Sequence, residues 1–229
     1  WLKGSGVEPQ MKSLILATVW RLSFAMADSV CRVAFSIWLR PSGATAERLA
    51  EVIAQVADQF QAPNFPPHVT LLGNAPKGVS IEEAKEMTEK LAKSIMPLEL
   101  KVLPEIVFQN TWNQNVLMYV EESEALQSAN SLAREILLKQ HADGHDGHRV
   151  PPAFAAPSRR PHLSLIYGDH PQEERSKIVS WIKDKAPWLN EGLSFEVEEL
   201  ELWAASPGFS VESVPSWYLV DRFKLQPKS

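Results

Sequence analysis

The stretch Pro67-His68-Val69-Thr70-Leu71-Leu72-Gly73 has a near copy further along the chain, Pro161-His162-Leu163-Ser164-Leu165-Ile166-Tyr167-Gly168. Both copies read proline, histidine, an apolar residue, a hydroxyl residue and leucine. With six histidines in the chain, chance supplies about 0.03 tetrapeptides of the form histidine, apolar, hydroxyl, leucine. Two copies, each preceded by proline, therefore indicate an internal repeat rather than an accident.

The repeated residues are typical of short strands that present one polar face. Side chains two positions apart on a strand point to the same side of a sheet. His68 and Thr70 should therefore project together, and His162 and Ser164 should do the same in the second copy. If the two strands lie beside each other across a pseudo-twofold axis, two imidazoles and two hydroxyls line one cleft.

Two imidazoles and two hydroxyls suit the hydrolysis of a phosphodiester. A histidine that titrates near neutral pH can act as a general base on water and as a general acid on the leaving alkoxide. Hydroxyl groups can donate hydrogen bonds to the phosphate oxygens, where negative charge grows in the transition state. We therefore predict His68 and His162 as catalytic residues and Thr70 and Ser164 as phosphate-binding residues. This chemistry needs no metal and no cofactor, and we expect neither.

The rest of the chain alternates between helical and extended patterns. A capping box of Ser80 and Glu83 opens one of the helices. The later strands come in pairs without helices between them, which favours an α+β fold with antiparallel sheets over a doubly wound parallel sheet. The predicted strands are 33–39, 68–72, 98–108, 116–121, 162–167, 193–204 and 217–225, and the predicted helices are 44–60, 81–95, 122–140 and 172–185.

Composition excludes several classes of protein. The chain has 28 acidic against 23 basic residues and a formal net charge of −5, whereas proteins that coat nucleic acid usually carry a strong basic excess. We therefore expect no stable complex with nucleic acid. A single cysteine, Cys31, cannot form an internal disulfide framework or a thiolate zinc site.

A long polar and proline-rich connection runs from His141 to Arg160. Its histidines and aspartates have a spacing that would permit a metal site, but we favour a solvated loop. Arg159 and Arg160 precede the second motif and could either meet a substrate phosphate or steer anions from the surface. The metal-site candidates within this connection are His141, Asp143, His145, Asp146 and His148.

The paired H-x-T-L and H-x-S-L motifs resemble those of the two-histidine phosphoesterase superfamily. Within it, Phe35-Ser36-Ile37-Trp38-Leu39 followed by a helix, and the two motifs themselves, are similar to the plant and fungal cyclic phosphodiesterases. The resemblance extends from about Val33 to Leu225 and implies a bilobal fold. In that fold, two pseudo-twofold-related lobes, each with an antiparallel sheet and helices, flank a central cleft.

The same resemblance implies an activity and further site residues. Members hydrolyse ADP-ribose 1″,2″-cyclic phosphate to ADP-ribose 1″-phosphate, a step downstream of tRNA splicing, and open nucleoside 2′,3′-cyclic phosphates to 2′-phosphates. Tyr167 falls where the family has a tyrosine at the cleft, so it joins Thr70 and Ser164 as a phosphate-binding residue. By analogy, His162 would be the base and His68 the acid, although the two motifs are nearly symmetric. The chain would bind a small nucleotide substrate as a monomer.

The first thirty residues differ from the body. We expect residues 1–30 to be a leader, a targeting segment or a non-native extension, and residues 31–229 to form a single bilobal domain. The segment 11–20 is similar to a short signal peptide, but Arg21 interrupts its apolar run, which is also too short to span a bilayer. A start at Met26 and a cytoplasmic location are therefore favoured over a secreted or targeted protein, and no membrane association is expected.

Two other functions remain open on the sequence. An RNA-end-processing member of the superfamily would act on 2′,3′-cyclic or terminal phosphates of RNA, but it would be expected to carry a basic strip. A nucleotide-binding module without turnover would not need an acid–base pair of histidines. Trp38 could stack on an adenine near the cleft, but packing in the core is the favoured role.

Overall fold

The computed structural model describes residues 34–73, 79–138, 160–205 and 210–226. The chain divides into two units, Trp1–Arg32 and Val33–Ser229, and every described residue belongs to the second. The expectations for residues 1–30, for Cys31 and Arg159, and for the histidine and aspartate candidates between 141 and 148 therefore lie outside the described residues. None of the helices described is both long and apolar enough to cross a membrane.

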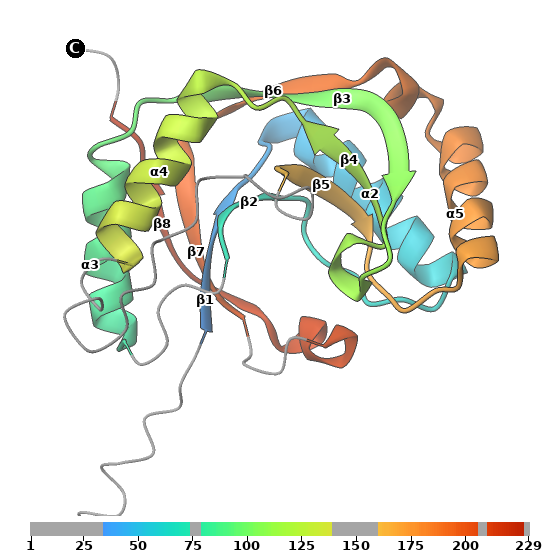
Figure 1. The fold of residues 1–229 in the computed structure, drawn as a ribbon, viewed down its shortest axis with the longest axis horizontal. Coiled ribbons are helices and arrows are strands. Elements are labelled where there is room, and N and C mark those ends of the chain that lie inside the picture. The colour runs from blue at the N-terminus through green and yellow to red at the C-terminus, as the bar shows by residue number, and fades with distance from the viewer. Residues whose placement is uncertain (1–33, 74–78, 139–159, 206–209, 227–229) are drawn as a thin grey trace, which may run out of the picture. The chain divides into compact units, whose positions relative to one another are not determined.

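The described strands form one antiparallel sheet of eight strands in the order β6-β3-β4-β5-β2-β1-β7-β8 (Figure 1). The two strands that carry the repeated motifs, β2 and β5, are neighbours at its centre, where Val69 pairs with Leu163. The strands are β1 (Ala34–Leu39), β2 (Val69–Leu72), β3 (Leu98–Phe108), β4 (Val116–Val120), β5 (His162–Ile166), β6 (Leu193–Val197), β7 (Glu199–Ala205) and β8 (Tyr218–Lys224).

The sheet consists of two halves of similar design that meet between β2 and β5. Outward from the centre, one half runs β2-β1-β7-β8 and the other runs β5-β4-β3-β6. Each half contains a strand-helix-strand unit in which the two strands are neighbours, β1 with β2 and β4 with β5. This arrangement confirms the predicted α+β class and its two-lobed plan, and it shows that the sheets of the two lobes are continuous.

The helices interlock the two halves. The described α-helices are α2 (Gly43–Gln59), α3 (Ile81–Ala92), α4 (Glu124–Leu138) and α5 (Gln172–Lys185), and the short 3-10 helices are η1 (Trp112–Gln114), η4 (Pro187–Glu191) and η5 (Val211–Ser216). Helix α2 follows β1 but packs against β5 and α5, whereas α4 follows β4 but packs against β2 and α3. Each half is therefore covered partly by a helix that starts in the other half, so neither half has a complete core alone.

Local sequence accounts for the helices. On α2, Leu49, Val52, Ile53 and Val56 are buried and recur at helical spacing. The predicted capping box opens α3, because the Ser80 hydroxyl accepts the Glu83 amide at 3.2 Å and the Glu83 carboxylate accepts the Ser80 amide at 2.8 Å. These bonds satisfy amides that lack partners within the first turn of a helix.

Alternation along the strands separates an apolar face of the sheet from a polar one. The apolar side chains belong to the main core: Ile37, Leu39, Val69, Leu71, Leu163, Leu165, Leu200 and Leu202. Since neighbouring positions on a strand point to opposite faces, the intervening residues project from the other face. His68 and Thr70 are therefore on the same side of the sheet as His162, Ser164 and Trp38.

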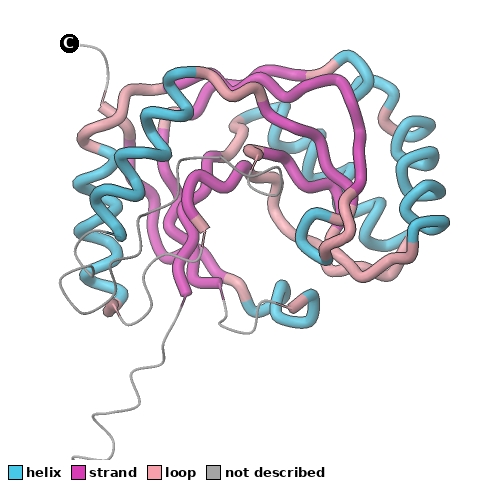
Figure 2. The backbone as a smooth tube through the Cα atoms, in the orientation of Figure 1, coloured by secondary structure: helices cyan, strands magenta, loops and turns pink. Residues whose placement is uncertain are grey.

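The sequence predicts one strand over residues 193–204, and this prediction is wrong. The segment forms β6, which pairs with β3, and β7, which pairs with β1 and β8. Phe195 and Val197 are buried in the first part and Leu200 and Leu202 in the second, so the two-residue period changes phase near Glu198. β6 is an edge strand, and β7 is one strand from the opposite edge. A connection through Glu198 alone requires the sheet to curl strongly, as Figure 2 shows.

Candidate active site

The two motif histidines are held in the same way. The Nδ1 atom of His68 lies 2.8 Å from the carbonyl oxygen of Pro66, and the Nδ1 atom of His162 lies 2.8 Å from the carbonyl oxygen of Arg160. A carbonyl can only accept a hydrogen bond, so Nδ1 carries the proton in both rings. In the neutral form, each Nε2 therefore keeps its lone pair and can accept a proton.

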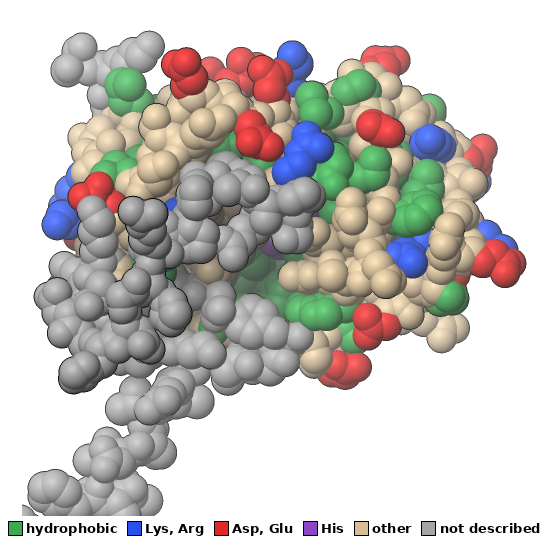
Figure 3. Space-filling view, viewed as in Figure 1, with side chains coloured by type: hydrophobic (Ala, Val, Ile, Leu, Met, Phe, Trp, Pro, Cys, Tyr) green, Lys and Arg blue, Asp and Glu red, His purple; other side chains and the backbone are tan. Residues whose placement is uncertain are grey.

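Strand pairing brings the four motif side chains to one place. Val69 and Leu163 are opposite each other across the antiparallel β2–β5 pair, and both are fully buried in the core. Continuing this register sets His68 level with Ser164 and Thr70 level with His162. A positive charge on His162 lowers the pKa of His68 further, as expected for imidazoles on neighbouring strands. Figure 3 shows histidine atoms recessed in a hollow on this face of the molecule.

Tyr167 links the two motifs. Its hydroxyl lies 3.4 Å from Nε2 of His68 and also forms a hydrogen bond with Ser164. The Ser164 hydroxyl in turn donates to the carbonyl oxygen of Asn113, within η1, at 3.3 Å. Burial raises the pKa of the Tyr167 phenol, against the opposing effect of Ser164. The phenol therefore stays protonated and can donate a hydrogen bond.

Aromatic rings hold the His68 imidazole from two sides. Trp38 stacks on it with 3.6 Å between ring centroids and 7° between planes, and Phe65 meets it edge-on at 6.1 Å. Trp203 stacks on the far side of Trp38 at 4.3 Å. Trp38 is thus a buried residue, as favoured from the sequence, and it is also a direct neighbour of a predicted catalytic histidine.

Burial favours the neutral form of both imidazoles in the substrate-free site. It lowers the pKa of His68 to about 3, a decrease that the Pro66 carbonyl opposes and that the charges of His162 and Arg40 increase. Burial also lowers the pKa of His162, against the opposing effect of the Arg160 carbonyl. Since a nearby anion stabilises an imidazolium, a bound phosphate would reverse part of this decrease.

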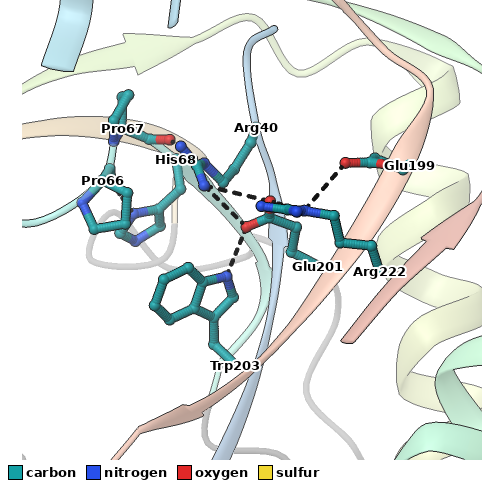
Figure 4. Close-up of polar contacts among 8 residues, drawn as sticks. All are labelled: Arg40, Pro66, Pro67, His68, Glu199, Glu201, Trp203 and Arg222. Atoms are coloured by element: carbon teal, nitrogen blue, oxygen red, sulfur yellow. Dashed lines mark hydrogen bonds and ion pairs between the residues drawn. The ribbon is translucent and has the colours of Figure 1, made fainter. Parts of the chain in front are cut away.

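The structure also adds Arg40, Glu201 and Trp203 to this site, where the sequence placed none of them. Arg40 lies next to the first motif, because its Nε donates to the carbonyl oxygen of Pro67 at 3.1 Å. Glu201 accepts hydrogen bonds from both Arg40 and Trp203 (Figure 4). One sequence pattern could have indicated them. In both Trp38-Leu39-Arg40 and Glu201-Leu202-Trp203, a charged residue stands two positions from a tryptophan, on the same face of an otherwise apolar strand.

Arg160, which the sequence offered as a possible contact for a substrate phosphate, interacts with neighbouring side chains. Arg160 pairs with Glu122 at 3.5 Å and stacks its guanidinium over Tyr119 at 4.1 Å, so part of its side chain is committed to the protein surface. Within the described residues, no group of three or more histidine, cysteine or carboxylate side chains is arranged to hold a metal ion.

Comparison with known proteins supports this assignment of fold and family. Residues 33–226 match the family described as "Cyclic phosphodiesterase-like protein". The Arabidopsis thaliana protein named "Cyclic phosphodiesterase" is 23% identical over 178 residues, which cover 76% of this chain and 87% of that protein.

One solved structure shares the fold. TT0787 of Thermus thermophilus has a TM-score of 0.50 at 16% identity, covering 86% of this chain and 100% of its own. E. coli LigT, solved in complex with 3'-AMP, has a TM-score of 0.47 at 14% identity, covering 85% and 99%. Because the family match includes all eight strands of the sheet and both histidine motifs, the chain belongs to the cyclic phosphodiesterase-like family of the two-histidine phosphoesterase superfamily and is a phosphodiesterase.

Proposed function

We propose that this enzyme hydrolyses a cyclic phosphodiester by acid–base catalysis with His68 and His162 and without a metal. The observation that carries the proposal is the matched anchoring of the two rings. Each Nδ1 bonds the carbonyl two residues upstream at 2.8 Å, so each Nε2 is the atom left for proton transfer. Two such rings on neighbouring central strands form an acid–base pair around a single phosphate.

In the proposed reaction, Nε2 of one imidazole removes a proton from water as the water oxygen attacks phosphorus. The bond from phosphorus to one ring oxygen of the cyclic ester breaks. The imidazolium of the other histidine gives its Nε2 proton to that departing oxygen, which becomes a hydroxyl. The product is a phosphomonoester, and both proton transfers are reversed by exchange with solvent.

Three hydroxyl side chains would bind the phosphate in this proposal. Thr70 is partly exposed on the same face as His68, while Ser164 and Tyr167 are buried and hydrogen-bonded to each other. The raised pKa of Tyr167 keeps its proton in place as a donor. Donors held in a largely dry site stabilise the charge that develops on the phosphate oxygens, and the Ser164 hydroxyl would turn from the Asn113 carbonyl to the phosphate to do so.

We assign the base role to His162 and the acid role to His68, as the family resemblance implies. His162 is partly exposed at the start of β5, which gives an attacking water access to its ring. His68 must be protonated to act as the acid, but its pKa in the substrate-free site is about 3. The assignment therefore requires the negative charge of the bound substrate to raise the pKa of His68.

The proposed substrates are ADP-ribose 1″,2″-cyclic phosphate, opened to the 1″-phosphate, and nucleoside 2′,3′-cyclic phosphates, opened to 2′-phosphates. The similarity to a plant cyclic phosphodiesterase supports a cyclic ester. Partly exposed Trp112 and Trp217 adjoin Tyr167, with ring centroids 5.7 and 6.0 Å away. Such rings beside the reacting centre suit stacking with a nucleobase.

The experiment is a product assay in the presence of EDTA with both substrates, for the wild-type chain and for His68→Ala and His162→Ala. We expect turnover that resists the chelator and falls by about 10²- to 10⁴-fold in each variant. His170→Ala is the matched control, because His170 bonds Asn115 at 3.0 Å rather than belonging to the pair. The position of the phosphate in the product, determined by NMR, identifies the bond that breaks.

Each alternative has its own outcome once RNA ending in a 2′,3′-cyclic phosphate and a measurement of nucleotide binding are added to this assay. Hydrolysis only of RNA ending in a 2′,3′-cyclic phosphate would replace the proposed substrates with an RNA end. Loss of turnover in EDTA that added metal restores would contradict the metal-independent mechanism. Tight nucleotide binding by folded protein without turnover of any of these compounds would contradict the proposed catalysis.

A further inference from the structure

Glu201 is a buried carboxylate on the polar face of the sheet. It is 3% exposed, and four contacts surround its two oxygens. Oε1 accepts from Arg222 Nε at 2.9 Å and Arg40 Nη1 at 3.3 Å, while Oε2 accepts from Trp203 Nε1 at 2.7 Å and Arg40 Nη1 at 3.2 Å. Burial of a carboxylate is costly unless it is paired and hydrogen-bonded, and here it is both.

The sheet itself sets this carboxylate level with the catalytic centre. Trp38 of β1 is opposite Glu201 of β7, which is opposite Arg222 of β8, and Trp38 is also opposite Thr70 of β2. The row therefore runs across four neighbouring strands at one level. Its side chains are close enough to contact one another, as is usual for residues directly opposite in an antiparallel pair.

Two routes lead from Glu201 to His68. In the first, Glu201 holds Arg40, and Arg40 Nε donates to the carbonyl of Pro67 at 3.1 Å, one residue before His68. In the second, Glu201 fixes the indole of Trp203, which stacks on Trp38, which in turn stacks on the imidazole of His68. Figure 4 shows Glu201 between Arg40, on the side of Pro67 and His68, and Arg222.

The two routes constrain different parts of the histidine. Arg40 fixes the backbone of the Pro66-Pro67 segment, whose first carbonyl also accepts the hydrogen bond from Nδ1 of His68. The tryptophan stack fixes the plane of the ring. We propose that Glu201 is a positioning residue for His68, acting through Arg40 and Trp203 without contacting the substrate; the inference rests on the proposed catalytic role of His68.

Charge gives Glu201 a second effect on the same site. The positive charge of Arg40 acts on His68, and Glu201 offsets that charge because it is paired with Arg40 at 3.2 Å. Replacement of Glu201 by a neutral residue would leave Arg40 and Arg222 without their shared carboxylate. The protonated form of His68 would then be less favourable, in addition to being less well oriented.

The test compares Glu201→Gln, which keeps the shape of the side chain and removes its charge, with Arg40→Lys. Lysine keeps the positive charge of Arg40 but cannot reach Pro67 and Glu201 through two nitrogens at once. Asp221→Asn is the matched control: Asp221 neighbours Arg222 on β8 but pairs with Lys85 at 2.7 Å. We expect kcat to fall about 10- to 100-fold in both test variants with KM changed less than about threefold, and the control to keep wild-type kinetics.

A double-mutant cycle distinguishes positioning from a general loss of structure. If Glu201 acts through His68, Glu201→Gln lowers kcat in the wild-type background but not in the His68→Ala background. Melting curves and circular dichroism identify any variant that fails to fold. If Glu201→Gln does not fold, Arg40→Lys provides the test instead, because the Arg40 side chain is partly exposed.

The outcomes separate this inference from the proposed function. If His68→Ala keeps wild-type kcat, the proposed mechanism fails. If His68→Ala loses activity while folded Glu201→Gln and Arg40→Lys keep wild-type kcat, the positioning role alone is overturned. Equal losses from Glu201→Gln in the wild-type and His68→Ala backgrounds would also overturn it, as would a loss that appears only in KM.

Discussion

Val69 of β2 pairs with Leu163 of β5 at the centre of the sheet, and each lies directly between the histidine and the hydroxyl residue of its own motif. Both side chains are fully buried in the main core. The packing that joins the two halves of the sheet therefore also sets the spacing between the two proposed catalytic residues. Stability and geometry of the site are coupled at this pair.

Replacement of Leu163 by alanine tests that coupling. We expect the free energy of unfolding to fall by about 2–5 kcal/mol, because the substitution leaves a cavity in a close-packed core. We also expect kcat to fall, since His162 and Ser164 flank the cavity. Urea denaturation and steady-state kinetics on the same preparations measure the two effects.

The control is Leu189→Ala in η4, where the side chain is equally buried but lies away from the motifs. A similar loss of stability with wild-type kcat is expected there. Equal kinetic effects of the two substitutions would contradict a special role for the β2–β5 pair.

Removal of single hydroxyl groups should weaken transition-state binding. Thr70→Val keeps the branched shape, and Ser164→Ala removes only the hydroxyl oxygen, so both should fold. We expect kcat/KM to fall about tenfold in each, corresponding to a lost hydrogen bond of about 1.4 kcal/mol to the phosphate. Steady-state kinetics with a cyclic nucleotide measure the loss; Thr88→Val, which removes a buried hydroxyl bonded within α3, should leave kcat/KM unchanged.

Anion binding should change the titration of His68. The pKa of His68 is about 3 in the substrate-free site, and a phosphate anion next to Nε2 favours the imidazolium. We expect the pKa measured by NMR from the ring nitrogens to rise by at least about one unit on saturation with a nucleoside 2′-phosphate. An unchanged pKa at saturation would argue against His68 as the acid.

The low pKa of His68 also predicts how stability depends on pH. In the unfolded chain the imidazole titrates near 6.5, whereas in the folded chain it titrates at about 3. Between these values the unfolded state binds the additional proton. The contribution of His68 to stability is therefore complete above about pH 6.5 and is lost as pH falls towards 3.

As pH falls through that window, His68 should lower the free energy of unfolding by up to about 1.4 kcal/mol for each pH unit. Denaturation at several pH values gives the slope. His68→Asn should reduce it, since asparagine does not titrate; an unaltered slope in that variant would show that another group causes the acid sensitivity.

Much of the fold could be predicted from the sequence. The repeated motifs predict two matched strands, and helical spacing such as that of Leu49, Val52 and Val56 predicts α2 closely. The capping residues Ser80 and Glu83 predict the start of α3. These features are local, because a period or a cap involves residues within a few positions of one another. The single strand expected over residues 193–204 is wrong, because the two-residue period of buried side chains changes phase near Glu198.

The sequence by itself determined which motif residues share one face of a strand: His68 with Thr70, and His162 with Ser164. Only the tertiary structure decided that β2 and β5 are neighbours through Val69 and Leu163 and that Tyr167 reaches His68. The tertiary structure also decided that Glu201, 161 residues from Arg40, supports the first motif. The reason is that a period of two fixes the face on which a side chain lies, whereas the identity of the neighbouring strand depends on how the whole core packs.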